Sequence, residues 1–224
     1  MKELKEILTN PLSGLDKDDL DGVKERFHKR AKTLFENYGL KCGDKIFRFA
    51  ELEFYYYKND ESGDNNWDAT WNRETYPRNK DAGELFFHYS GVDICFQCHF
   101  NEKEKDNEYG EFGGILIRSL LDDDKIIAGP LFCVNTMLNE CKGQMPELVS
   151  VPSQTFTFET TTRCGIKSDL KQEKGKELYL CYYTTSVNNK NLQWDKASER
   201  IAWDKSKKRF TNQTRNYKKE RNFK

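Results

Sequence analysis

The run KIFRFAELEFYYY, residues 45–57, constrains the fold more than any other, because it sets two glutamates among closely spaced aromatic side chains. Such aromatic density is typical of a central β-strand. Residues two apart on a strand point to the same side, so Glu51 and Glu53 share a face. Charged side chains are rarely buried without a partner or a function. We therefore predict a sheet built on this strand, with two carboxylates on one of its faces.

Five more runs of aromatic or β-branched residues predict further strands. They are GELFFHYS (83–90), VDICFQCHF (92–100), GGILIRSL (113–120), QTFTFETTTRCGI (154–166) and ELYLCYYTTS (177–186). The polar segment 58–83 cannot bury itself and predicts a long surface loop. Helices are predicted at 16–40, from apolar residues at helical spacing, and at 130–141, which opens on a proline. Asp16 or Asp18 is expected to cap the first helix.

The formal net charge of +0 hides an uneven distribution along the chain. Residues 205–224 hold nine Lys or Arg and one Glu, so this tail carries +8 and the remainder −8. A basic tail beside an acidic body favours sequence-independent attraction to phosphates. A solvated, disordered terminus explains the same charges. Both interpretations stay open.

Seven cysteines are scattered along the chain, and CFQCH (95–99) has the spacing of a haem-attachment site. This is strand sequence, so Cys95 and Cys98 point to opposite faces and do not both reach one haem. Three histidines and no second close cysteine pair leave a structural zinc site short of ligands. We predict reduced thiols, no metal and no cofactor. The first residues lack the apolar run of an export signal, which predicts a cytoplasmic protein without a membrane partner.

Arg118 and two aromatic residues carry further potential chemistry. Arg118 follows an apolar strand segment, and a buried arginine normally has a carboxylate partner. Glu53 with Arg118 would orient and deprotonate a water, while Tyr55 or Phe87 could sandwich a planar base. Two alternatives remain: the glutamates pair structurally with Arg48 or face water, and the aromatic rings belong to the core.

The order of these pieces resembles the alkyladenine (3-methyladenine) DNA glycosylases. FAELEFYY is similar to that family's strand with its catalytic glutamate, and YPRNKDAGELFFHYSG to its Pro-Arg-Asn loop and aromatic hairpin. GGILIRSL is similar to its arginine strand, and AGP to the start of its next helix. The resemblance covers residues 45–141, and it lies in the shared order and spacing of motifs that are individually weak.

The resemblance implies roles for individual residues. Glu53 would activate the hydrolytic water, Arg118 would help hold Glu53 and that water, and Tyr55 would stack on the flipped base. Phe87 or His88 would form the opposite wall of the pocket, and Gln97 would be a polar pocket residue. Arg78 and Asn79 would belong to the loop near the site. Ser90 and Gly91 would form the hairpin tip that meets nucleic acid.

Three departures bear on the implied function. Ser90 stands where the family inserts a bulky tyrosine into the duplex, and a serine cannot fill a base stack. The loop histidine expected between Tyr55 and Arg78 is missing. The helix after Pro130 lacks the family's small-residue-then-lysine start. The pocket and the DNA face would therefore differ even where the water-activating pair is kept.

Together these observations predict one α/β (α+β) glycosylase-like domain over residues 1–204, with helices in 1–40, a sheet core in 45–185 and the basic tail 205–224. The sheet is expected to be mixed, largely antiparallel and curved. The expected activity is release of an alkylated or deaminated purine from nucleic acid, DNA rather than RNA, with no obligate protein partner. Two alternatives stay open: a non-catalytic nucleic-acid-binding protein that kept the fold, and an N-glycosidase acting on small nucleosides.

Overall fold

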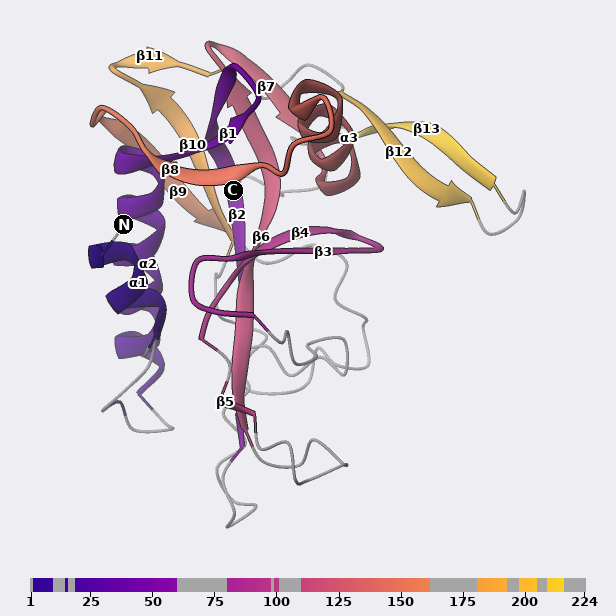
Figure 1. Ribbon diagram of the computed structural model, residues 1–224. Coiled ribbons are helices and arrows are strands. Elements are labelled where there is room, and N and C mark those ends of the chain that lie inside the picture. The colour runs from indigo at the N-terminus through magenta and orange to yellow at the C-terminus, as the bar shows by residue number, and fades with distance from the viewer. Residues whose placement is uncertain are drawn as a thin grey trace.

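The computed structural model describes residues 2–9, 15, 19–59, 80–97, 99–100, 110–161, 181–192, 198–204 and 209–215. Within these ranges, helices α1 (Lys2–Thr9), α2 (Leu20–Asn37) and α3 (Pro130–Cys141) accompany a curled antiparallel sheet that forms a half-barrel. The chain is an α+β protein. Figure 1 shows α1 and α2 on one side of the long central strands and α3 on the other.

The sheet is organised around two long neighbouring strands, β2 (Lys45–Asn59) and β6 (Gly110–Asp122). Its other strands are β1 (Tyr38–Cys42), β3 (Leu85–His88), β4 (Gly91–Cys95), β5 (His99–Phe100), β7 (Lys125–Ala128), β8 (Glu147–Ser150), β9 (Phe156–Thr161), β10 (Cys181–Val187) and β11 (Lys190–Asn191). The main path runs β11–β10–β2–β6–β4–β3. Every pairing in the described part of the chain is antiparallel, which corrects the expected mixed sheet. Short turns join several of these neighbours, and a parallel pair would need a long crossover.

The local sequence pattern located most of these elements. Each of the six predicted strand segments contains a strand, and α3 begins at Pro130 and ends at Cys141 as expected. Strands β1, β7, β8 and β11 were not predicted, because runs of two to five residues give little periodic signal. Most of the predicted polar loop, residues 60–79, lies outside the described part of the chain.

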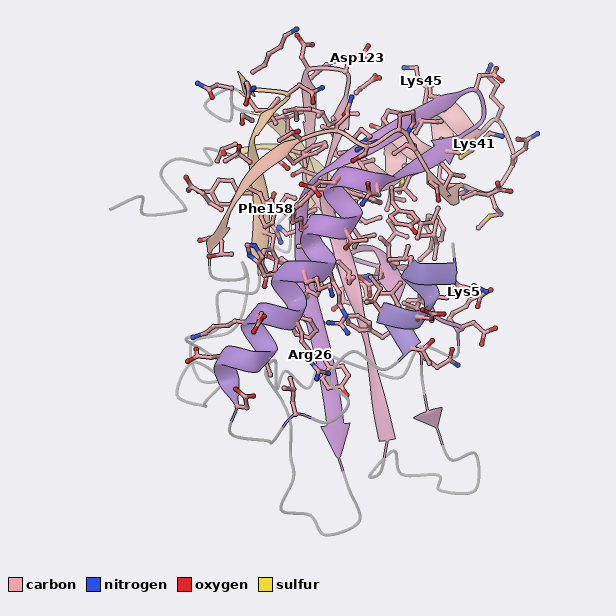
Figure 2. The ribbon with its side chains drawn as sticks, turned by 90° about the vertical axis from the view of Figure 1, so that its left-hand side faces the viewer. Lys5, Arg26, Lys41, Lys45, Asp123 and Phe158 are labelled. Carbon is pink, nitrogen blue, oxygen red and sulfur yellow. The ribbon has the colours of Figure 1, made fainter. Side chains whose placement is uncertain are left out.

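The main core lies between the sheet and the first two helices. Phe27 of α2 packs on Phe54 of β2, with ring centroids 4.9 Å apart, and on Phe96, at 6.0 Å. Figure 2 shows α2 crossing this face of the sheet with Phe158 beside it. Arg30 of α2 donates from Nε to the carbonyl of Ile7 at 2.7 Å, which ties the end of α1 to α2. The buried guanidinium thus satisfies a carbonyl that the helix end leaves open.

The start and end of α2 differ from the expectation. Asp19, rather than Asp16 or Asp18, caps the helix, and its Oδ1 accepts from the N–H of Gly22 at 2.8 Å. The chain passes from Asn37 directly into β1 at Tyr38. At this junction Arg48 donates to the carbonyls of Phe35 and Glu36, both at 2.8 Å. The last turn of the helix is therefore closed by a side chain from the neighbouring strand.

The basic segment 205–224 is in part a strand. Strand β13 (Arg209–Arg215) pairs with β12 (Ser198–Asp204) in an antiparallel hairpin, from Ser198 opposite Arg215 to Asp204 opposite Arg209. This hairpin projects on the α3 side of the molecule (Figure 1). The expected boundary between the domain and the basic tail, at residue 205, therefore falls between two strands that pair with each other. Backbone pairing, and not the charge of the side chains, determines the structure of residues 198–204 and 209–215.

Candidate functional site

One face of the sheet carries a row of side chains that the core does not use. Glu53 lies opposite Cys181 of β10 and Leu116 of β6, and Leu116 lies opposite Asp93 of β4. Directly paired residues in a sheet point to the same side. The adjacent row, with Phe54 opposite Ile115 and Ile115 opposite Ile94, belongs to the core. The acidic row therefore lies on the sheet face away from α1 and α2.

The pairing of β2 with β6 shifts register twice beside Glu51. Phe49 pairs with Leu120 and Glu51 with Ser119, but Leu52 pairs with Ile117. The register passes over Ala50 on β2 and Arg118 on β6. Arg118 lies two residues beyond Leu116 on β6, so strand alternation places it on the face of the two glutamates, and the shift sets Ser119 opposite Glu51.

Glu53 and Arg118 contact each other, as the sequence led us to expect. Arg118 Nη1 lies 3.3 Å from Glu53 Oε2, and the hydroxyl of Tyr55 donates to the same oxygen at 2.8 Å. The Glu53 residue is 0% exposed and Arg118 is 5% exposed. A carboxylate held by two donors at this depth has a fixed orientation, and its charge interacts strongly with any group placed beside it.

Glu51 completes a buried group of three charges. Arg118 Nε lies 3.3 Å from Glu51 Oε1, and the Ser119 hydroxyl donates to Oε2 at 2.8 Å. The thiol of Cys181 donates to Oε1 at 3.4 Å. Two carboxylates thus share one guanidinium, and with both ionised the group carries a net charge of −1. Such a group favours a developing positive charge nearby.

Arg48, the alternative partner of these glutamates, is occupied elsewhere. Besides the carbonyls at the end of α2, it donates to the carbonyl of Pro152 at 3.2 Å, and its guanidinium lies 5.2 Å from the ring centroid of Phe156. Burial lowers the pKa of Arg48. The interpretation that Arg48 neutralises the two acids is therefore wrong.

The backbone of β6 is held close to β2 and to the start of α3. A Cβ on Gly113 would collide with the carbonyl oxygen of Tyr55, so glycine is needed for this approach. The carbonyl of Arg118 accepts from Gly129 N at 2.8 Å and also contacts the thiol of Cys133 at 3.5 Å. Burial, with a smaller contribution from Glu51, raises the pKa of Cys133, so this thiol stays protonated.

The hairpin of β3 and β4 extends the polar face. His88 Nε2 lies 3.3 Å from Asp93 Oδ1, and Ser90 Oγ lies 2.8 Å from His88 Nδ1. Of the two candidates for the wall of a base pocket, His88 shares the face of Asp93. Phe87 pairs with Val92 and packs against the core on the other side. Tyr89, at the turn, is 78% exposed.

Gln97 is not brought to Glu53. Its Oε1 accepts from the N–H of Ala82 at 3.2 Å, its Nε2 donates to Asp81 at 3.4 Å, and its backbone N–H donates to Leu8 at 3.0 Å. These bonds anchor the chain beside α1. The chain leaves the regular strand β4 at Cys95, so alternation along the strand no longer governs where residue 97 points.

Gly91 lies directly after the hairpin turn, where there is no room for a side chain. A Cβ there would approach Leu116 Cδ1 to 2.8 Å and Pro130 Cβ to 2.9 Å. Gly91 therefore lets β4 pass close to the first residue of α3. Arg78 and Asn79 fall outside the described residues.

Three members of the site were not found from the sequence. Ser119 and Cys181 carry no signal, because only the pairing of β6 and β10 with β2 places them beside Glu51. Asp93 did carry one: it is a charged residue within the apolar run VDIC, as the two glutamates are in their own strand. It is 1% exposed.

No group of three or more His, Cys, Asp or Glu side chains suited to a metal ion occurs among the residues that the structure describes. The described helices include none with the length and apolar character needed to cross a membrane. Comparisons with protein-family models, with curated proteins and with solved structures gave no match to this chain.

Proposed function

We propose that this protein hydrolyses the N-glycosidic bond of an alkylated or deaminated purine in DNA, with Glu53 as the general base. The observation that carries the proposal is the fully buried Glu53 carboxylate, whose Oε2 is held by Arg118 at 3.3 Å and by Tyr55 at 2.8 Å. The order of sequence motifs shared with the alkyladenine DNA glycosylases supports it. In this proposal the half-barrel is a divergent form of that family's fold.

The reaction needs little beyond this group of residues. Water attacks the sugar carbon that bears the base and passes one proton to Glu53, while the bonding electrons leave with the base. As the bond breaks, the sugar gains the positive character of an oxocarbenium ion. Before Glu53 takes that proton, Glu51, Glu53 and Arg118 together carry a net charge of −1 with both carboxylates ionised. This charge stabilises the developing positive charge without reorganisation, because each side chain is already held. No metal or cofactor takes part in this scheme.

The hairpin tip supports a macromolecular substrate. Ser90 is too small to fill a base stack, and its hydroxyl is engaged by His88. Tyr89, one residue earlier at the same turn, presents a large aromatic ring that is 78% exposed. An exposed ring of this kind is suited to stack on bases. We therefore assign the contact with unpaired or distorted bases to Tyr89.

The test is base release from end-labelled oligonucleotides, single- and double-stranded, that contain hypoxanthine, ethenoadenine or a methylated purine. Alkali cleavage reports the abasic sites. We expect product from the wild-type protein and none from Glu53→Gln. Glu147→Gln, on an exposed strand position, is the matched control and keeps full activity. Tyr89→Ala is expected to lower release from the duplex more than release from the single strand.

The complete burial of Glu53 also favours a second function, a nucleic-acid-binding protein without catalysis. Glu53 is 0% exposed and contacts Arg118, and an internal ion pair with a purely structural role has the same features. Salt-sensitive binding of oligonucleotides, with no abasic product on any substrate, would establish this second function and exclude the first.

A further inference from the structure

Three side chains of the β3–β4 hairpin form a chain of contacts separate from Glu53. Ser90 Oγ lies 2.8 Å from His88 Nδ1, and His88 Nε2 lies 3.3 Å from Asp93 Oδ1. The residues are two and five apart in sequence, and the hairpin turn brings them together. His88 pairs with Gly91, which has no side chain to crowd the imidazole from the opposite strand.

The contacts indicate which nitrogen of the His88 ring carries the proton. Nδ1 faces two donors, the Ser90 hydroxyl and, at 3.4 Å, the Ser90 backbone N–H. It therefore acts as the acceptor. With Nδ1 as the acceptor, the neutral ring carries its proton on Nε2, which lies 3.3 Å from Asp93 Oδ1, close enough for electrostatic attraction. This is the proton arrangement in which an imidazole is ready to remove a proton from a serine hydroxyl.

Burial decreases from Asp93 through His88 to Ser90, the order that a chain of proton transfer ending at the surface needs. Asp93 is 1% exposed and lies between Phe86 of β3 and Leu116 of β6, so its position is fixed by two strand pairings. The His88 side chain is 10% exposed, and it stacks on Phe86 with ring centroids 6.0 Å apart. Ser90, at the turn, is only half-buried. The acid is therefore held inside and the hydroxyl is at the surface.

We propose that Ser90, His88 and Asp93 form a nucleophilic triad that hydrolyses small carboxylic esters. Compared with the usual serine triad, the two nitrogens exchange roles, since Nδ1 serves the serine and Nε2 the carboxylate. The role of each triad residue is set by its geometry, and it does not depend on the order of the residues in the chain or on which ring nitrogen contacts the serine. The exposed ring of Tyr89 beside Ser90 favours esters with an aromatic alcohol as the leaving group.

The reaction proceeds in two balanced halves. Ser90 Oγ bonds to the ester carbonyl carbon and its proton moves to His88 Nδ1; the carbon–oxygen bond to the alcohol then breaks, and the alcohol leaves with that proton. Water next attacks the acyl-serine, gives one proton to Nδ1, and Ser90 leaves with it as the free hydroxyl. The net change is one ester and one water converted to one acid and one alcohol. Asp93 stabilises the imidazolium in both halves.

The experiment measures covalent labelling of Ser90 by an alkyl fluorophosphonate and turnover of p-nitrophenyl acetate by the full-length protein. We expect a single adduct on the peptide that contains Ser90, and its loss in Ser90→Ala. His88→Gln and Asp93→Asn are expected to lower both rates roughly 100-fold or more, the usual share of a general base. Ser153→Ala, at an exposed loop serine, is the control and leaves both rates unchanged.

Two results would overturn the triad. One is folded wild-type protein that takes up no label at Ser90, a result that needs no variant to fold. The other is labelling that proceeds at the wild-type rate in a folded His88→Gln protein, as judged by its urea midpoint. Neither result depends on Glu53 or on base release, so this proposal and the proposed glycosidic function succeed or fail separately.

Discussion

Replacing Arg118 by methionine probes the buried charge group most directly. The substitution keeps most of the side chain's volume but removes the only cation that contacts both Glu51 and Glu53 among the ion pairs of the described residues. Breaking a buried ion pair by removing one partner costs about 3–5 kcal/mol, because the remaining charge has no compensation. We expect that loss in the free energy of unfolding. For a chain of this size it corresponds to a fall of roughly 6–20 °C in Tm.

The assay is urea denaturation followed by tryptophan fluorescence, with the wild type and Arg118→Met measured at the same pH. Adding Glu51→Gln and Glu53→Gln to Arg118→Met removes the unpaired charges, and we expect it to restore about 2 kcal/mol or more of the loss. Lys45→Met is the surface control. Lys45 contacts Asp122 at 3.2 Å but is largely solvated, so its loss should change the midpoint little. An Arg118→Met protein within about 1 kcal/mol of the wild type would refute the reasoning.

Three further predictions concern packing, strand approach and pH. Phe27→Ala should lower the free energy of unfolding by about 3–5 kcal/mol in the same urea assay, because a fully buried ring is lost beside Phe54. Gly113→Ala should lower Tm and weaken the proposed activity together, because its Cβ would push β6 from the carbonyl of Tyr55; an unchanged Tm would contradict the close approach. Burial raises the pKa of Cys133, so the unfolded chain releases a thiol proton that the folded chain keeps. Stability is therefore expected to fall as the pH rises through about 8.5, and Cys133→Ala should reduce that slope in urea midpoints measured from pH 7 to 10.

The two candidate centres divide one face of the sheet between them. Glu53 and Asp93 lie in the same row, separated by Leu116. The two acids contact different basic side chains: Glu53 contacts Arg118, and Asp93 contacts His88. A variant at one centre can therefore be combined with a variant at the other, and additive effects on stability would show that they are energetically independent.

Much of the fold could be predicted because its signals are local. Aromatic and β-branched runs located strands β2 to β6, β9 and β10, and Pro130 located the start of α3, because each pattern depends on residues a few positions apart. The shared face of Glu51 and Glu53 followed from the two-residue repeat of a strand alone. The predicted cap of α2 was wrong by one to three positions: Asp19 caps the helix, in place of the neighbouring Asp16 or Asp18.

The partners of the site residues depended on pairing between distant strands. The expected contact of Glu53 with Arg118 is present, but it depends on the pairing of β6 with β2, which no local pattern in the sequence reveals. The residues themselves suggested that pair and the resemblance to a known family agreed with it, although the residues also left Arg48 open as the partner. Gln97 shows the converse: the chain departs from β4 before residue 97, so the expected position next to the pocket is not reached.

The sequence by itself determined which segments become strands and helices, which acids share a face, and that charged groups would have to be accommodated within an apolar sheet. The tertiary structure alone decided that Ser119 and Cys181 bind Glu51, and that a hairpin turn joins Ser90, His88 and Asp93. The physical reason is the range of the interactions. Strand alternation and helix periodicity act within a few residues, while hydrogen bonds to a buried charge are fixed by strand register across more than a hundred residues of chain.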